Sequence, residues 1–120
     1  IADDPEDGDL EIDYAYVVDE NDSHQALGTK ARDILIKRGH LKQNVFNHTS
    51  RVQGHDLSHG YLVVVYSRFR IDRDFYQAYG LGASLYSFEE AEKRAVENLS
   101  TYCWAWEKEK GYVVKEEVEF

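Results

Sequence analysis

The chain is poor in the residues that crosslink, start or interrupt a fold. Its 120 residues include one cysteine, one proline and no methionine. A single cysteine excludes an internal disulfide framework and any zinc module built on several cysteines. The longest apolar run, residues 61–66, is far shorter than the roughly 20 residues that a membrane-spanning helix needs. We therefore expect one domain that buries a core without covalent or metal crosslinks.

Methionine is also missing from the first position, which holds Ile1. We expect a processed or excised chain, and removal of a signal peptide is one route to it. Three N-glycosylation patterns, at Asn21, Asn47 and Asn98, favour secretion. Asn98 falls inside a predicted helix, so at least that match is accidental. The expected location is secreted or periplasmic.

Lysine and arginine are absent from the first 22 residues, which hold ten of the 23 acidic residues. The other 13 acids face 14 bases, so the formal charge of −9 comes from the N-terminal end. Residues 1–9 contain five acids and the only proline, and they predict a disordered acidic leader before a single domain over 10–120. Such a leader either steers the chain toward a basic partner or serves as a solvated terminus.

The hydrophobic pattern predicts an α+β fold in the order β-α-β-β-β-α-β. Alternation over 10–18 indicates a half-buried strand with Glu11 on its solvent side. Residues 61–66 are apolar on both faces, as in a central strand. A helix is expected to end at Gly39, and another to begin at the capping box Ser87–Glu90 and end at Gly111. Further strands are expected over 75–82 and 112–120, and a weaker one over 44–52. These elements predict a mostly antiparallel sheet with both helices on one face.

Four of the five histidines lie between residues 40 and 59. His48, His55 and His59, with Asp56 between them, form a donor set that suits Zn²⁺, or Cu²⁺ or Ni²⁺. Their spacing is not that of a known zinc motif, and flanking glycines argue against a helix that would align them. Ordinary loop histidines are the competing interpretation.

Motifs for a serine nucleophile and for nucleotide phosphate binding are missing. The sequence has no G-x-S-x-G, no Walker A motif and no complete G-x-G-x-x-G. Cys103 lies on the apolar stripe of the second predicted helix, where a cysteine acts as a small hydrophobic residue. The sequence therefore favours a protein that is not an enzyme.

Residues 80–84 with Ala91, Ala95 and Leu99 resemble the last strand and helix of double-stranded-RNA-binding domains. Those domains contact phosphate through lysines at the start of that helix. This chain has Phe88, Glu89 and Glu90 there, and the two glutamates repel phosphate. The resemblance implies a topology only, and the two glutamates argue against nucleic acid as a partner.

Aromatic residues make up 13% of the chain, more than one buried face accommodates. Trp104 would project away from Trp106 on a helix, so we expect it to contact either a partner or a second packing surface. Tyr76 and Tyr79 are further candidate anchors, and the acids expected to steer the encounter are Asp3, Asp4, Asp7 and Asp9. The leading interpretation is a small non-enzymatic protein-binding module of inhibitor or immunity type. The alternatives are a metal-binding protein or metal-dependent enzyme using His48, His55, Asp56 and His59, and a domain cut from a larger secreted protein.

Overall fold

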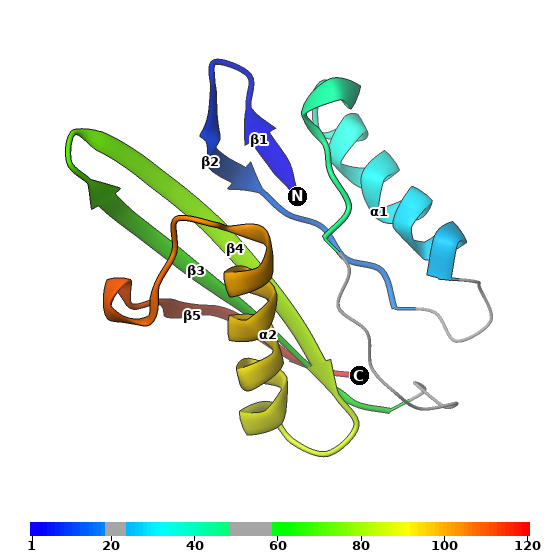
Figure 1. Ribbon diagram of the computed structural model, residues 1–120. Coiled ribbons are helices and arrows are strands. Elements are labelled where there is room, and N and C mark those ends of the chain that lie inside the picture. The colour runs from blue at the N-terminus through cyan, green and yellow to red at the C-terminus, as the bar shows by residue number, and fades with distance from the viewer. Residues whose placement is uncertain (19–23, 49–58) are drawn as a thin grey trace.

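The chain forms two helices and a five-stranded sheet in a computed structural model that describes residues 1–18, 24–48 and 59–120 (Figure 1). The strands lie in the order β1-β2-β4-β3-β5, and only β2 and β4 run parallel. This arrangement confirms the predicted α+β class. The elements along the chain are β1 (Ala2–Asp4), β2 (Asp7–Asp13), α1 (His24–Lys37), β3 (Tyr61–Ile71), β4 (Asp74–Ser84), α2 (Phe88–Tyr102) and β5 (Val113–Glu119), with short 3₁₀ turns at Lys42–Asn44 and Lys108–Lys110.

The first nine residues differ from the expected disordered leader, because they form β1 and the start of β2. Ile1 and Ala2 are buried, and Ile1 exchanges two backbone hydrogen bonds with Phe46. Two of the acids stabilise the turn between β1 and β2. Asp4 accepts a hydrogen bond from the Glu6 amide, and Asp7 accepts one from the Asp9 amide. Two apolar residues with partners far along the chain outweigh a local composition typical of disorder.

One other predicted strand is shorter than the pattern indicated, and another is described only in part. The alternation over 10–18 continues a strand only as far as Asp13. Within 44–52, the described part contributes one isolated bridge, between Val45 and Ala2, and residues 49–58 lie outside the described residues.

The hairpin of β3 and β4 is the centre of the sheet. Its strands pair from Tyr61↔Ser84 to Ile71↔Asp74 around a two-residue turn. Asp72 in that turn has a φ of 56°, a left-handed conformation that Asp tolerates better than most side chains. Residues 63–65 are fully buried on both faces, which agrees with the predicted central strand.

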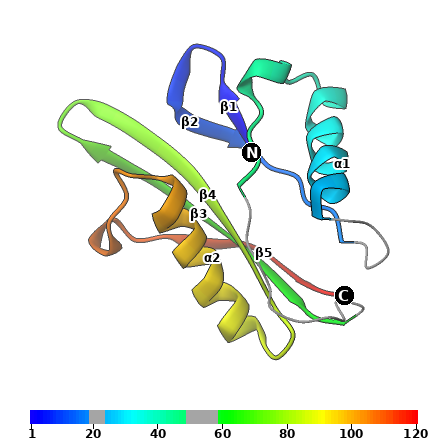
Figure 2. The ribbon, with the colours of Figure 1, turned by 45° about the vertical axis from the view of Figure 1, so that its right-hand side comes forward.

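α2 packs on one face of this hairpin (Figures 1 and 2). At Gly80 and Gly82 of β4 the helix backbone lies directly against the strand. A Cβ at Gly80 would lie 2.2 Å from the Ala95 carbonyl oxygen, and one at Gly82 would lie 2.2 Å from the Ala95 nitrogen. Ser87 caps the helix by accepting the Glu90 amide at 3.1 Å, as predicted. The helix ends at Tyr102, earlier than the expected Gly111.

The opposite face of the sheet is covered in part by residues 14–16. Tyr14 and Tyr16 donate hydrogen bonds to the two carboxylate oxygens of Glu116 on β5, at 2.6 and 2.7 Å. These bonds hold the segment after β2 against the sheet, and the chain then leads toward α1.

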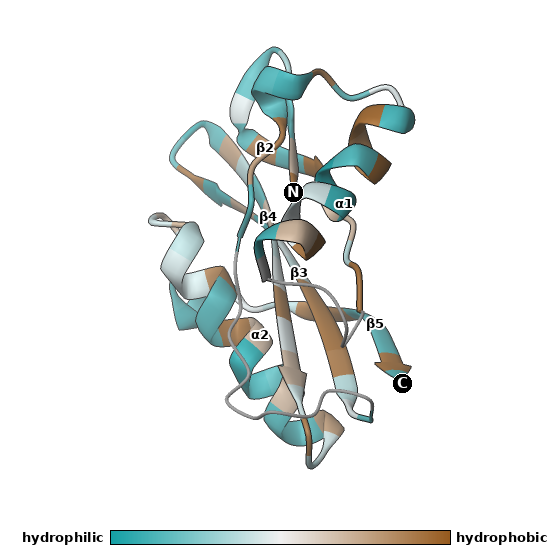
Figure 3. Cartoon of the chain, turned by 90° about the vertical axis from the view of Figure 1, so that its right-hand side faces the viewer, coloured by the Kyte–Doolittle hydropathy of each residue, from teal (hydrophilic) through white to brown (hydrophobic). Residues whose placement is uncertain are grey.

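α1 packs at the β1 end of the sheet, where Leu35 contacts Ala2 and Val45 (Figure 2). It lies apart from α2, beside β1. Figure 3 shows a long hydrophobic stretch on β3, whereas the turn between β1 and β2 is hydrophilic. Neither helix of the described residues combines the length and apolar character needed to cross a membrane.

The glycine contact predicts a steep stability cost for one methyl group. We expect Gly82→Ala to lower the free energy of unfolding by about 2–3 kcal/mol, because the helix backbone must move to admit the Cβ. Urea denaturation measures the change. Gly8→Ala is the matched control, since nothing lies within 4 Å of its Cβ position. Equal stability of the two variants would contradict the close contact.

Candidate functional site

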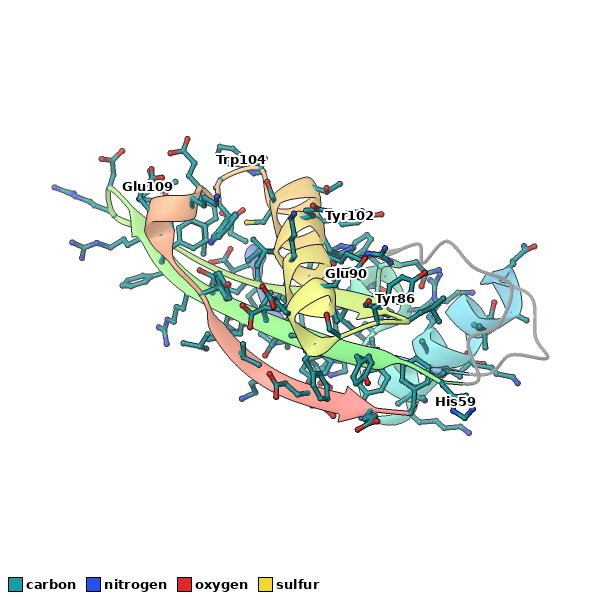
Figure 4. The ribbon with its side chains drawn as sticks, turned by 90° about the horizontal axis from the view of Figure 1, so that it is seen from below. His59, Tyr86, Glu90, Tyr102, Trp104 and Glu109 are labelled. Atoms are coloured by element: carbon teal, nitrogen blue, oxygen red, sulfur yellow. The ribbon has the colours of Figure 1, made fainter. Side chains whose placement is uncertain are left out.

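Trp104 is the most exposed large hydrophobic side chain of the described residues, at 80%. α2 ends two residues earlier, and its last turn is closed by the Cys103 amide donating to the Leu99 carbonyl at 2.9 Å. The Trp106 amide then donates to the Cys103 carbonyl, which forms a tight turn. Figure 4 shows Trp104 on this turn, beyond the C-terminal end of α2.

The residues around Trp104 are fixed, although its own side chain is open. Ala105 and Trp106 are each 6% exposed, and the Trp106 indole donates to the Gly111 carbonyl at 3.0 Å. The Tyr76 and Trp104 rings form a T-shaped pair with a centroid separation of 5.9 Å and an interplanar angle of 89°. The core thus supports the indole on one side and leaves the rest of it to solvent.

The two tyrosines expected to join Trp104 as partner anchors are both buried. Tyr76 stacks on Phe69 beneath α2, and Tyr79 lies on the opposite face of the sheet against Tyr14 and Tyr66. Each is 8% exposed, so neither offers its ring to a partner. The structure therefore narrows the aromatic part of the candidate surface to Trp104, with Tyr76 as its support.

The acids expected to steer a partner fall into two pairs. Asp7 and Asp9 are exposed on β2, whereas Asp3 and Asp4 on β1 are partly buried. Burial raises the pKa of Asp3. Tyr76 also has a raised pKa, first through burial and then through the negative charges of Asp9 and Asp74. The pairing of β2 with β4 at Leu10↔Gln77 brings Asp9 level with Tyr76 along the two strands. We define the Trp104 surface as the exposed residues Trp104, Asp7 and Asp9, with Tyr76 as the buried support of the indole.

A buried cluster of titratable groups joins β2 to the end of α2. Glu11 accepts the Tyr79 amide at 2.8 Å, and its other oxygen lies 3.9 Å from Nδ1 of His48. The His48 ring stacks on Tyr102 at 4.2 Å with an angle of 4°. Burial raises the pKa of Glu11 to about 7 and lowers the pKa of His48 to about 4.

Of the four expected metal ligands, the described part of the chain contains His48 and His59. His48 is partly buried, and its Nδ1 has no hydrogen-bond partner among the described residues. His59 is exposed near the start of β3, and His55 and Asp56 lie outside the described residues. Within residues 1–18, 24–48 and 59–120, no three His, Cys, Asp or Glu side chains are placed to share an ion.

Cys103 lies partly buried at the end of α2, against the core that contains Val63 and Trp106. Burial raises the pKa of its thiol, which lowers the thiolate fraction at neutral pH. The position therefore fits the packing role expected from the sequence.

Sequence reasoning missed the buried position of Glu11, because the alternation over 10–18 put it on the solvent side. In the structure Glu11 is 9% exposed and Ile12 is 38% exposed. The inversion follows from the pairing of β2 with β4 at Leu10↔Gln77, which directs the Glu11 carboxylate to the free Tyr79 amide. No local pattern indicates that pairing.

Glu11 predicts an unusual pH dependence of stability. Its raised pKa means that the folded chain holds the proton more tightly than the unfolded chain. The stabilisation is therefore complete below about pH 4.5 and lost as the pH rises through about 7. We expect Glu11→Gln, which keeps an acceptor for Tyr79, to raise the free energy of unfolding by about 2–3 kcal/mol at pH 8 and to change little at pH 4.5.

Denaturation of wild type and variant at both pH values measures that difference. Glu97→Gln, at an exposed position of α2, is the control for removing one carboxylate. A Glu11→Gln effect of equal size at both pH values would contradict the raised pKa.

Comparison of this chain with protein-family models, with curated proteins and with solved structures finds no match in any of the three. The fold and the Trp104 surface are therefore known from this chain's own residues. The function proposed below is supported by them alone.

Proposed function

We propose that the chain is a small non-enzymatic protein-binding module, of inhibitor or immunity type, that docks a basic partner on the Trp104 surface. The single observation that carries the proposal is the 80% exposure of Trp104 within a fixed turn. We propose a secreted or periplasmic setting for it, on the glycosylation patterns described above.

An exposed tryptophan is a suitable anchor because it supplies a large apolar area and a polar N–H with few rotatable bonds. Its backbone is already fixed between the end of α2 and the buried Trp106. Binding would therefore order little beyond the indole side chain itself, and the entropy lost on docking stays small.

The charges next to this anchor favour a basic partner. Asp7 and Asp9 are exposed, and no lysine or arginine occurs in the first 22 residues. Clustered charges of one sign accelerate the encounter with a partner of opposite sign, and salt weakens this effect. The indole would then provide most of the binding affinity, and the carboxylates would increase the association rate.

The test uses a photo-crosslinking amino acid placed at position 104 or at position 86. Tyr86 is 77% exposed and lies beyond the other end of α2, so it is a matched aromatic control (Figure 4). A partner that crosslinks at 104 and not at 86 is then purified and titrated. We expect Trp104→Ala to weaken its binding about 30-fold or more, as for a hot spot, and Tyr86→Ala to leave it unchanged.

The acidic half of the surface is tested by association kinetics with the same partner. We expect the double variant Asp7→Asn and Asp9→Asn to slow association at low salt and to leave dissociation unchanged. Equal crosslinking at 104 and 86, or full affinity in Trp104→Ala, would remove the proposed function. An unchanged association rate of the aspartate variant would contradict the proposal that the partner is basic.

A further inference from the structure

The sheet face opposite α2 is open near the turn between β3 and β4. Side chains alternate between faces along a strand, so the pairs Arg70↔Phe75 and Arg68↔Gln77 lie on the same face as Tyr66↔Tyr79. Tyr14 contacts Tyr79, and the segment it begins covers the sheet from that point toward β5. Beyond it, Arg68 and Arg70 are exposed and Phe75 is 47% exposed. We define the arginine strip as Arg68, Arg70 and Phe75.

Both guanidinium groups of the strip lie over a single aromatic ring. The Arg68 guanidinium carbon is 5.5 Å from the Phe75 centroid, and that of Arg70 is 5.9 Å away. Contact with the ring face stabilises each cation and limits its motion. It also brings two like charges together, which repel each other, and a bound anion would relieve that repulsion.

No counter-ion for the strip is found among the residues that the structure describes. Their ion pairs are made by Arg38, His40, His48 and Arg94, and none includes Arg68 or Arg70. The neighbouring Asp74 pairs with Ile71 and therefore lies on the α2 side of the sheet. The N–H donors of both guanidiniums remain available to a carboxylate from outside the chain.

We propose that the arginine strip is a second docking surface, which binds an acidic peptide segment of a protein partner. Arg68 and Arg70 are two residues apart on β3, about 6.6–6.8 Å along the strand. Alternate side chains of an extended peptide have the same spacing, so acids at every second position reach both guanidiniums. Each guanidinium can then hold a carboxylate through two parallel hydrogen bonds.

The geometry favours a peptide over single-stranded nucleic acid. Nucleic-acid surfaces of this kind stack bases on open aromatic rings. Here the face of Phe75 is already taken by the two guanidiniums, which leaves charge and hydrogen-bond donors as the means of recognition. The strip and the Trp104 surface differ in charge and lie on opposite sides of the sheet, so each can be tested without the other.

The test measures fluorescence anisotropy of a labelled peptide with glutamate and serine in alternation, titrated with the whole chain at low ionic strength. We expect Arg68→Ala and Arg70→Ala each to weaken binding about tenfold, the loss typical of one charge-assisted contact. Arg73→Ala is the matched control, because it removes the same charge from the adjacent turn. We expect it to change binding less than about twofold.

A second variant tests the aromatic support itself. Phe75→Leu keeps both arginines, and we expect it to weaken peptide binding about threefold or more because the guanidiniums lose their platform. Circular dichroism checks that each variant is folded. Failure of wild type to bind the peptide, equal losses in Arg68→Ala and Arg73→Ala, or tighter binding of an oligothymidine than of the peptide would each overturn the proposal.

Discussion

The direct contact of α2 with β4 is the constraint on which the rest of the structure depends. Gly80 and Gly82 let the helix backbone rest on the strand, and Ala91 and Ala95 provide the facing surface. This contact sets the position of the helix on the sheet, and at the end of the helix Trp104 meets Tyr76 and Tyr102 stacks on His48. The position of the proposed docking residue thus depends on a helix held against the sheet by two glycines and two alanines.

The same contact brings polar side chains of α2 to the edge of β4. Among the described residues, the backbone of this edge pairs with β2 only at Leu10↔Gln77. The Leu81 amide donates to the Asn98 side chain at 3.0 Å, and Arg94 donates to the Ala83 carbonyl at 3.1 Å. Glu11 takes the Tyr79 amide in the same way from β2. Side chains thus satisfy backbone groups that would otherwise be left open on an edge strand. The cost is a buried carboxylate, whose pKa is raised to about 7.

Features with local causes could be predicted from the sequence. The Ser87 cap, the end of α1 near Gly39 and the buried centre of β3 each follow from a few neighbouring residues. Features that depend on contacts between residues far apart in the sequence could not be predicted. The first residues are folded because Ile1 hydrogen-bonds with Phe46, and Glu11 is buried because of the register of β2.

Trp104 and the arginine strip illustrate the same limit at the candidate sites. Helical phase singled out Trp104, but its exposure arises because the helix has already ended and the chain turns there. The strip requires Arg70 to face Phe75, which holds only for a turn of two residues at 72–73. Turn length sets the pairing, because a change of one residue would move the side chains of one strand to the other face.

The contact between α2 and β4 also restricts which residues can occupy the positions that form it. At positions 80 and 82 any side chain meets helix backbone, and Ala91 and Ala95 are fully buried. Surface residues and loops are free to diverge, whereas this set must stay small to keep the helix in place. The spacing Gly-x-Gly, eight residues, Ala, three residues, Ala is therefore the pattern by which distant relatives of this chain can be sought.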